Sequence, residues 1–557
     1  MRKILSLACV LCLFLAFIPN TAAVRVYDPM IKVGLSYDSN ALAAANLQNV
    51  SGMDTGYAFG YFDEDREFVS TYEIDDENKI TVLKNTNLWL SGTTYSDTAL
   101  ANYSDTVGAY CLQIDEYFDL EDALDVIDEV EDEDYEAYLC YTPGGFRVRI
   151  GQFMTGEAAN EALEQVAADI GWELERRVPN GTCYTVVITG TDHILYQFDM
   201  LGEYPLGILP MSEQTWFKGY KYYGGFEYNR VSGNNINVIN VVGLTDYVKG
   251  VIPYEVSPSW PIESQKAQAL CAKSYTVNNL NKHRAKGFDL CNTTDCQVYY
   301  GTNNATEVSD EAVESVDGLF VIYDGKICQT YYHASSGGYT EDVGNIWGKD
   351  IPYLKAVEDI YLESTRPFSF TANLSQISWI LQTKGYVTKD VTDVYVSKYS
   401  DVGNVLALTV ELEDGTTKTF TGDRARTALN SPTLGFTVGS HRYTINGNTG
   451  ERTVNINGKQ VELDGLYVQG DGRKAEKIDL EDGVVALTAA GLTDITITEP
   501  QQQTHKKGEY TIAGTGSGHN IGLSQEGAKS MAKAGFNCEE IIEFYFTGAE
   551  VDYYDPN

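Results

Sequence analysis

Early in the chain a strand followed by a helix occurs twice, and this repeat constrains the fold more than any other sequence feature. Residues 110–114 and 146–150 each alternate apolar and polar side chains, as half-buried strands do. Apolar residues at helical spacing follow each of them: Leu120, Leu124, Ile127 and Val130 after the first, and Ala159, Leu163, Val166 and Ile170 after the second. With strands expected at 137–141 and 184–188, the pattern predicts a β-α-β-β-α-β module over residues 106–191, here called the repeat module. Helices on one face of its sheet would leave the other face free for a ligand.

The remaining sequence indicates an α+β protein with further units on both sides of this module. The 557 residues are enough for about three or four domains of ordinary size. Residues 24–105 alternate short apolar runs with Gly, Asn, Asp and Ser, which favours a β-rich N-terminal segment without a catalytic signal. Residues 192–557 are expected to form a larger α+β domain, and residues 401–510 within it a β-rich insertion.

The charge balance excludes one large class of partner. The formal net charge is −39 and the isoelectric point is near 4.4. A polyphosphate would meet a repulsive field here, whereas nucleic-acid binding needs a basic stripe. We therefore expect no nucleic-acid partner, and the acidity is typical of a protein that stays soluble after export.

The first residues have the layout of a secretory signal. Arg2 and Lys3 precede an apolar run over residues 4–18, and small residues end the segment at Ala23. The run is shorter than the roughly 20 residues of a spanning helix, so cleavage after residue 23 is favoured over an uncleaved anchor. The sequence thus predicts a secreted or cell-wall-associated protein. Its eight remaining cysteines permit disulfides, although buried free thiols fit as well.

One stretch of the repeat module resembles a known family. Residues 144–153, Gly-Gly-Phe-Arg-Val-Arg-Ile-Gly-Gln-Phe, are similar to the first strand of the SPOR domain family. Members of that family bind peptidoglycan glycan strands that have lost their peptides, so the resemblance implies denuded glycan strands as a partner. The alternative is an α+β spacer that serves packing alone.

Glu255 lies at the end of a segment that carries a candidate catalytic acid. Thr245 is a plausible N-cap, and Val248, Ile252 and Glu255 fall on one stripe if the helix continues past Gly250. A carboxyl group on an apolar stripe has a raised pKa, which suits a general acid that works near neutral pH. The alternative is that Pro253 breaks the helix and leaves Glu255 in solvent.

The next segment, residues 260–275, predicts a closely packed helix. Pro261 stands at a first-turn position, and many small residues follow it. Lys266 and Lys273 are two turns apart on one face, so both could line a groove and contact the carboxylate or hydroxyls of a sugar. Lysines more often extend to water, which is the structural alternative.

Four ordered blocks resemble the stage II sporulation protein D / amidase-enhancer family. They are residues 244–275, 291–301, 332–341 and 518–528. Sporulation members of that family are lytic transglycosylases that cut denuded glycan strands between N-acetylmuramic acid and N-acetylglucosamine and leave 1,6-anhydro ends. The resemblance implies this activity, a role in sporulation or cell-wall remodelling, and a larger SpoIID-type catalytic domain. It also assigns the catalytic carboxylate to Glu255.

The chain departs from the family pattern at several positions. Lys273 replaces a usual Arg, and Asp295 stands where members commonly carry His between two cysteines. Some members bind zinc in this region. His283, Cys291, Asp295 and Cys296 are therefore candidate ligands, although a disulfide between the two cysteines is favoured and no cofactor is required.

Several polar residues of the later blocks are candidates for binding the sugar. No Gly-x-Ser-x-Gly motif surrounds the serines, so a serine-hydrolase site is not indicated. We expect the candidates either to line a sugar-binding cleft or to orient Glu255, and a structural role is the alternative for each of them. They are His333, Ser335, Ser336, Tyr339, His519 and Gln525.

Three functions remain open at this point. A lytic transglycosylase needs a single acid–base residue, because the C6 hydroxyl of the sugar attacks C1 in place of water. A non-catalytic enhancer would bind glycan and stimulate an N-acetylmuramoyl-alanine amidase. A metal-dependent hydrolase would require a convincing ligand set around Cys291 and Cys296, which the spacing does not provide.

Overall fold

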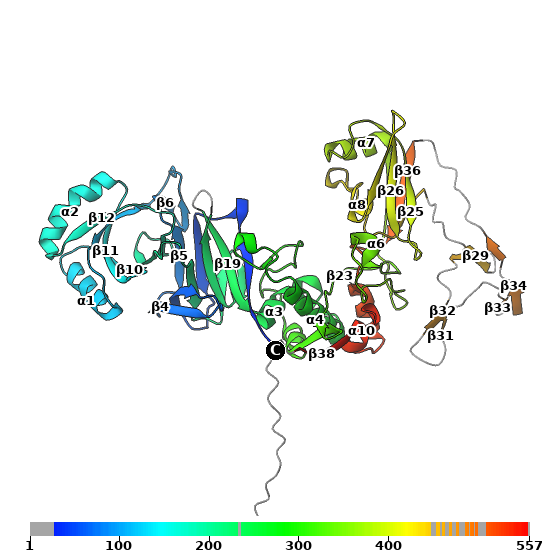
Figure 1. Cartoon of the computed structure of the whole chain (residues 1–557), viewed down its shortest axis with the longest axis horizontal. Coiled ribbons are helices and arrows are strands. Elements are labelled where there is room, and N and C mark those ends of the chain that lie inside the picture. The colour runs from blue at the N-terminus through cyan, green and yellow to red at the C-terminus, as the bar shows by residue number, and fades with distance from the viewer. Residues whose placement is uncertain are drawn as a thin grey trace, which may run out of the picture.

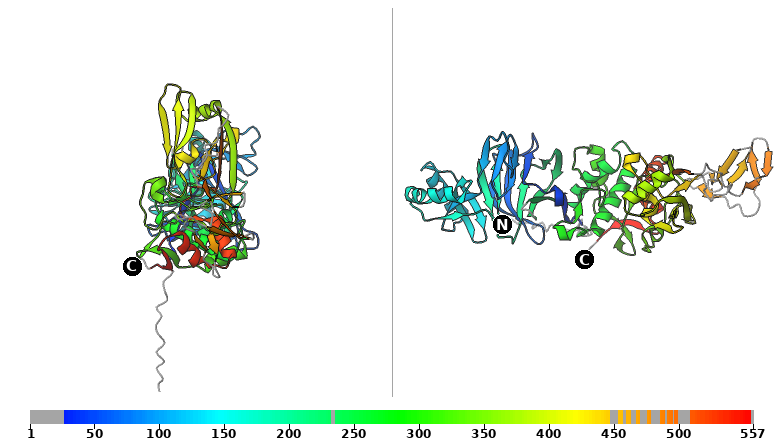
Figure 2. Two further views of the ribbon diagram at one scale, coloured as in Figure 1. Left: turned by 90° about the vertical axis from the view of Figure 1, so that its right-hand side faces the viewer. Right: turned by 90° about the horizontal axis from the view of Figure 1, so that it is seen from above.

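The computed structural model describes residues 27–231, 235–446 and 508–554, together with the backbone of short strands between 453 and 498 (Figure 1). The predicted signal, residues 1–23, lies outside the described residues. The fold is α+β, as predicted, and the described part contains no helix with the length and apolar character that a membrane span requires. Seen from above, the molecule is elongated, with the repeat module at one end (Figure 2).

A seven-stranded sheet joins the N-terminal segment to the larger domain. Its strands, in spatial order, are β20 (Leu290–Cys291), β1 (Met30–Ser36), β19 (Ile236–Gly243), β18 (Gly225–Arg230), β15 (Leu206–Pro210), β3 (Tyr57–Phe62) and β4 (Phe68–Ile74). β1 pairs antiparallel with β19 and parallel with β20. Residues 24–105, predicted as a segment of their own, therefore share sheets with residues far along the chain.

A ten-stranded sheet runs from the repeat module into the same N-terminal region. Its strands, in spatial order, are β12 (Leu174–Arg177), β9 (Tyr110–Ile114), β11 (Gly145–Phe153), β10 (Ala137–Thr142), β14 (Ile194–Phe198), β13 (Tyr184–Ile188), β5 (Lys79–Lys84), β2 (Ala44–Asn49), β16 (Gln214–Phe217) and β17 (Tyr220–Tyr223). No linker separates the module from its neighbours in this sheet.

Two helices of the repeat module form where the sequence predicts them. Helix α1 (Leu120–Glu131) begins after Asp119, whose side chain accepts the N–H of Asp122. Helix α2 (Gly156–Ile170) begins after Thr155 and ends at Gly171, which has the left-handed φ of 74° that glycine adopts without strain. Both helices pack on the same part of the sheet and place their apolar stripes against it.

The fourth strand of the repeat module differs from the prediction. β12 occupies the edge beside β9, whereas residues 184–188 form β13 and pair with β14 and β5. Both segments alternate apolar and polar residues, so the pattern alone could not distinguish them. The β-α-β-β-α-β order is therefore completed at Arg177.

The sheet face opposite the two helices is not free, which corrects a second expectation. A small sheet, made of β7 (Thr94–Ser96), β6 (Leu88–Ser91) and β8 (Asp105–Val107), packs over it. Leu90, Tyr95 and Val107 form one apolar cluster with Cys111 and Tyr138 of the module.

Arg149 lies under this cover and is held by the chain itself. It donates to Gln113 at 3.0 Å and to Gln197, and it lies 3.7 Å from Asp199. The edge strand β12 keeps partly exposed side chains, and the buried Arg147 guanidinium of β11 stacks on the exposed Tyr117 ring at 4.0 Å.

The larger domain has a helical core built around one buried helix. Its elements are α3 (Leu244–Glu255), α4 (Ile262–Asn278), α5 (Glu307–Glu314), α6 (Val343–Trp347), α9 (Gln525–Lys533), α10 (Cys538–Tyr545), β21 (Leu319–Tyr323), β22 (Lys326–Ile327), β23 (Tyr332–His333), β37 (Leu523–Ser524) and β38 (Glu550–Tyr553). α4 contacts α3, α5, α9, α10 and β21. Its small side chains, such as Ala267, Ala269 and Ala272, let these neighbours approach closely on all sides.

A unit with its own hydrophobic core is inserted into this domain. Its elements are β24 (Pro367–Asn373), α7 (Leu374–Thr383), β25 (Val391–Tyr399), β26 (Val405–Leu412), β27 (Thr417–Thr421), α8 (Asp423–Thr427), β28 (Tyr443–Ile445) and β36 (Glu509–Thr515). We call it the inserted unit. Its core includes Ala372, Ile377 and Val394, so the unit begins before residue 401, where the sequence pattern places its start.

Short strands continue the inserted unit between β28 and β36. They are β29 (Thr453–Ile456), β30 (Lys459–Glu462), β31 (Tyr467–Gln469), β32 (Ala475–Lys477), β33 (Val485–Thr488), β34 (Gly491–Asp494) and β35 (Thr496–Thr498). The described residues of this stretch thus form strands.

Candidate active-site cleft

Helix α3 continues to Glu255 despite the proline in its last turn. It begins at Leu244, with Gly243 as the N-cap in place of the predicted Thr245. The N–H of Thr245 donates to Asp28 Oδ1 at 2.8 Å, so a carboxylate from the N-terminal segment caps the helix. Pro253 is buried within the helix, and the Val256 N–H still donates to the Ile252 carbonyl. The alternative of a broken helix is therefore wrong.

Glu255 lies partly buried at the edge of a cleft. Its Oε1 accepts the backbone N–H of Val298 at 3.3 Å, and the side chains of Tyr332 and Gln525 hydrogen-bond to it as well. Burial raises the pKa of Glu255 above 4.5, while the three hydrogen bonds act in the opposite direction. A carboxyl group in this setting can give up a proton and is then stabilised as a carboxylate.

The cleft has a volume of about 670 Å³. It is lined by Glu255, Tyr275, Asn279, Lys282, Thr294, Asp295, Cys296, Gln297, Val298, Tyr331, Tyr332, His333, Trp347, Asp423, Gly518 and His519. Aromatic rings and polar groups alternate along it, which suits a sugar, since a pyranose ring presents apolar faces and a rim of hydroxyls.

His333 and His519 line the cleft as predicted, and both are neutral near pH 7. Their ring centroids are 5.4 Å apart. Burial, aided by His519, lowers the pKa of His333 far below 6.5, and burial lowers the pKa of His519 to about 4. His333 Nδ1 donates to the Ile521 carbonyl at 3.2 Å, which leaves Nε2 as a buried acceptor without a partner among the described residues.

Of the predicted sugar contacts Gln525 and Lys266, only Gln525 lies close to Glu255. Gln525 donates to Gln268 Oε1 at 3.3 Å and hydrogen-bonds to Glu255, so it orients the acid. Lys266 pairs with Glu263 at 2.9 Å and does not line the cleft.

Lys273 is a structural residue here, contrary to the prediction of a sugar contact. Its side chain is 0% exposed, and Nζ donates to the Val316 carbonyl at 3.0 Å and lies 3.4 Å from Asp317. Burial lowers the pKa of Lys273, and the Asp317 carboxylate opposes this effect. Helical spacing placed Lys266 and Lys273 on one face, but that face packs against α5 and β21 at Lys273.

Ser335, Ser336 and Tyr339 do not line the cleft but brace the loop behind it. Ser335 exchanges backbone hydrogen bonds with Ser517 at 2.8 and 3.0 Å. Ser336 Oγ donates to the buried Asp359 at 2.6 Å. These contacts hold the loop that carries His519.

Asn520 ties the same loop to the serine segment. It is fully buried with a left-handed φ of 66°, and its side chain donates to the carbonyls of Ser336 and Tyr339 at 2.7 and 3.1 Å. An amide side chain can satisfy both carbonyls at once, which explains a polar residue at this turn.

Tyr332, Trp347, Lys282 and Asp423 were missed as cleft residues by sequence reasoning. Tyr332 lies next to His333 within the third resembling block, so its position was a usable signal. Asp423 comes from the inserted unit, and nothing in its local pattern relates it to Glu255. The pKa of Asp423 is held well below its ordinary value, first by the His441 imidazole, whose Nε2 lies 3.8 Å away, and then by Trp347 and Arg426.

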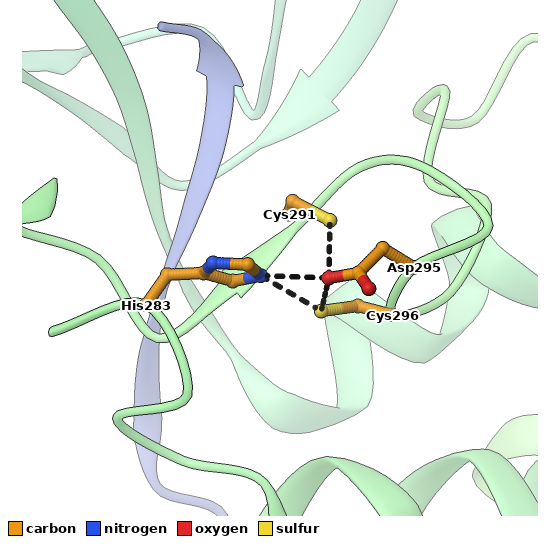
Figure 3. A group of neighbouring side chains, drawn as sticks. All are labelled: His283, Cys291, Asp295 and Cys296. Atoms are coloured by element: carbon orange, nitrogen blue, oxygen red, sulfur yellow. Dashed lines mark hydrogen bonds and ion pairs between the residues drawn. The ribbon is translucent and has the colours of Figure 1, made fainter. Parts of the chain in front are cut away.

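Four potential metal ligands come together beside the cleft (Figure 3). His283 Nε2 lies 3.3 Å from both Cys296 Sγ and Asp295 Oδ2, and each cysteine sulfur lies 4.0 Å from the same carboxylate oxygen. Around a tetrahedral zinc ion with bonds of ~2.0–2.3 Å, ligand atoms are roughly 3.3–3.8 Å apart. The residues present therefore fit a zinc ion. Cys291 and Cys296 are free cysteines in the structure and do not form a disulfide.

The surroundings of this group are polar and come from two parts of the chain. The hydrogen bond from Cys296 lowers the pKa of Cys291 to about 4, and the same contact raises that of Cys296. Lys282 lies 3.2 Å from Asp295, and the Tyr37 hydroxyl hydrogen-bonds to Cys291. A thiolate is the form of cysteine that binds a metal.

Comparison with known proteins identifies two domains. Residues 232–323 match the Stage II sporulation protein family, SpoIID, and residues 106–171 match the SPOR domain. The first match covers α3, α4 and the cysteine pair, and the second covers most of the repeat module.

Three relatives align with more than half of the chain. An uncharacterized protein of Brachyspira hyodysenteriae is 28% identical over 63% of this chain and 78% of its own length. The Amidase enhancer of Bacillus subtilis is 28% identical over 55% of this chain and 40% of its own length. Stage II sporulation protein D of Bacillus subtilis is 25% identical over 56% of this chain and 76% of its own length. Together with the matched domains and the cleft around Glu255, these similarities show that the chain contains a SPOR domain followed by a SpoIID-family domain.

Proposed function

We propose that this protein is a lytic transglycosylase that acts on peptidoglycan in the cell wall. It cleaves denuded glycan strands between N-acetylmuramic acid and N-acetylglucosamine and leaves 1,6-anhydro ends. One observation carries the proposal: Glu255, with a raised pKa, lies at the edge of an open, sugar-sized cleft. The SpoIID and SPOR domains support a wall-associated location and peptidoglycan as the ligand.

The chemistry requires one carboxyl group in two roles. Protonated Glu255 donates its proton to the glycosidic oxygen as the bond from C1 to that oxygen breaks. The resulting carboxylate accepts the proton of the C6 hydroxyl while that oxygen bonds to C1, so no water is consumed. The Val298 N–H, Tyr332 and Gln525 stabilise the carboxylate between the two steps.

The neutral histidines contribute binding. His333 lines the cleft, and its buried Nε2 acceptor has no partner among the described residues, so this imidazole is the candidate to accept a sugar hydroxyl or acetamide N–H. Because both imidazoles are uncharged near pH 7, they leave the proton transfers to Glu255.

A zinc ion held by His283, Cys291, Asp295 and Cys296 would have a structural role and not a catalytic one. Four protein ligands complete a tetrahedral shell, which is typical of structural sites, whereas catalytic zinc keeps an open position. When bound, the ion would crosslink the loop that leads to Val298, the residue whose N–H contacts Glu255. A metal-dependent hydrolase is therefore the weaker proposal.

A second candidate is a non-catalytic enhancer of an N-acetylmuramoyl-alanine amidase. The similarity to a protein named Amidase enhancer favours it. In that case the purified chain would bind glycan without releasing anhydro ends and would stimulate an added amidase.

The test compares wild-type protein with Glu255→Gln and, as a matched control, Glu311→Gln on the exposed side of α5. Each is incubated with denuded and with peptide-bearing sacculi, and the released ends are identified by mass spectrometry. Loss of anhydro ends with Glu255→Gln alone supports the transglycosylase. Anhydro ends released equally by Glu255→Gln, or none released by the wild type, would reject it.

A further inference from the structure

A second cavity opens on the inserted unit beside the active-site cleft. It has a volume of about 610 Å³. It is lined by Lys384, Gly385, Tyr386, Lys418, Thr419, Phe420, Thr421, Asp423 and Arg424. Asp423 also lines the cleft that holds Glu255, so the two hollows are neighbours. We call this second hollow the cationic cavity.

Its charge is opposite to that of the protein as a whole. The chain carries a net charge of −39, yet Lys384, Lys418 and Arg424 line this cavity with Asp423 as its one carboxylate. In the part of the chain that the structure describes, no carboxylate lies within ion-pair distance of these three cations. Asp423 is engaged elsewhere, since it contacts Trp347 and His441. An anionic group would thus find uncompensated positive charge here.

Two of the cations are held in place without being neutralised. Lys384 Nζ donates to the carbonyls of Thr427 and Ala428 at 3.0 Å each, at the C-terminal end of α8. The Arg424 guanidinium lies 5.7 Å from the centroid of the Tyr386 ring. Positioned donors lose less conformational entropy when they bind than freely moving side chains do.

The cavity also offers the partly exposed ring of Tyr386, an apolar surface that can pack on a sugar ring. Tyr386 and Phe420 line it, with ring centroids 5.4 Å apart. Rings next to cations match a ligand that has an apolar ring face and a negative charge on the same residue. A simple inorganic anion would not use the aromatic part of the site.

We propose that the cationic cavity binds the free lactyl carboxylate of an N-acetylmuramic acid residue on the glycan strand that occupies the cleft. This inference rests on the proposed function and adds a specificity determinant to it. A muramic acid that still carries its peptide has an uncharged amide at this position, so it lacks the carboxylate charge that the three cations of the cavity would contact. The cavity thereby selects glycan from which the peptides have been removed.

The test measures binding separately from turnover, in the Glu255→Gln background. Affinity is measured by isothermal titration for a denuded muramic-acid-containing oligosaccharide and for the same oligosaccharide with its carboxyls converted to methylamides. The variant Lys418→Gln/Arg424→Gln removes two charges from the cavity and leaves Lys384, which holds α8, unchanged. The control Lys389→Gln/Lys398→Gln removes two charges from exposed positions of the same unit outside the cavity.

The cavity variant is expected to bind the carboxylate ligand about tenfold more weakly at low salt and the methylamide ligand unchanged, because two exposed charge contacts are lost. The control variant keeps the affinity for both ligands. Equal affinity of the unmodified cavity for carboxylate and methylamide ligands, or an equal loss for both in the cavity variant, overturns the inference.

The outcome is distinguishable from failure of the proposed function, because no bond is cleaved in the assay. Absence of anhydro ends in the digestion of sacculi would reject the transglycosylase and leave a charge-selective binding difference standing. A folded cavity variant is verified by its melting temperature, so that a loss of affinity cannot result from unfolding.

Discussion

The indole N–H of Trp347 donates to Oδ2 of Asp423 at 3.1 Å. Trp347 ends α6 of the larger domain and Asp423 begins α8 of the inserted unit, so this bond joins the two where both line the cleft. The inserted unit thus supplies part of the lining of the cleft that holds Glu255.

We expect Asp423→Asn to lower stability in a pH-dependent way. The folded pKa of Asp423 lies below its unfolded value, so its contacts stabilise the protein above about pH 4 and lose that effect as the pH falls further. The difference in unfolding free energy between wild type and variant should be constant from about pH 8 to pH 5 and should shrink in acid. Urea titrations at a series of pH values check this, and a pH-independent difference would contradict it.

The rate of the proposed transglycosylase activity is predicted to fall at alkaline pH as Glu255 loses its proton. Burial raises its pKa, so the proton needed for bond cleavage is lost at a higher pH than for an ordinary carboxyl group. The protonated form is the better-accommodated one, so Glu255 contributes stability at low pH that disappears as the pH rises through its folded pKa.

Two measurements test that assignment. Replacement by Gln should reduce the rate roughly 100- to 10,000-fold and remove this part of the stability profile. The initial rate of anhydro-end formation, measured from about pH 4 to 9, gives the loss of activity. Thermal unfolding over the same pH range gives the stability profile. If the stability of Glu255→Gln still decreased with rising pH as that of the wild type does, a group other than Glu255 would be responsible for the decrease.

Metal analysis of the purified protein should find about one zinc per chain. Removal of the metal with a chelator should lower the melting temperature, because the ion would tie His283 to the segment of residues 291–296. Cys296→Ser is expected to abolish the zinc content, whereas Cys538→Ser, a half-buried cysteine outside the group, retains it. A Cys291–Cys296 disulfide found by peptide mapping under non-reducing conditions would overturn this prediction.

Lys273→Ala is predicted to destabilise the fold without changing sugar affinity. The substitution leaves a cavity beside Phe320 and removes the donor to the Val316 carbonyl, for a loss of about 2–5 kcal/mol. Lys273→Met fills the space and should recover much of this loss. Unfolding titrations give the stability, and the KM of the folded protein should match wild type for both variants. A raised KM with unchanged stability would restore the role in sugar binding.

Local patterns predicted what is local in this fold. The strand–helix repeat could be predicted because each half has its own spacing of apolar residues. Each of its helices also has its own N-cap residue, Asp119 in the first and Thr155 in the second. Glu255 was found through a short block around one helix. The two histidines of the cleft were reached in the same way.

Non-local relationships were not readable from one sequence. β1 pairs with β19 across about two hundred residues, so residues 24–105 showed no sign of their partner. Helical spacing placed Lys266 and Lys273 on one face of α4. It could not predict that α5 and β21 pack against that face at Lys273. Asp423 became part of the cleft only through the docking of the inserted unit.

The continuous ten-stranded sheet makes the SPOR domain a fixed arm. From β12 to β17 it has no hinge segment, and β17 contacts α3, the helix that ends in Glu255. A saccharide bound at the β12 edge would therefore lie at a fixed distance from the bond that is cleaved beside Glu255. With the proposed activity, the released glycan fragments would fall into discrete chain lengths instead of a random distribution.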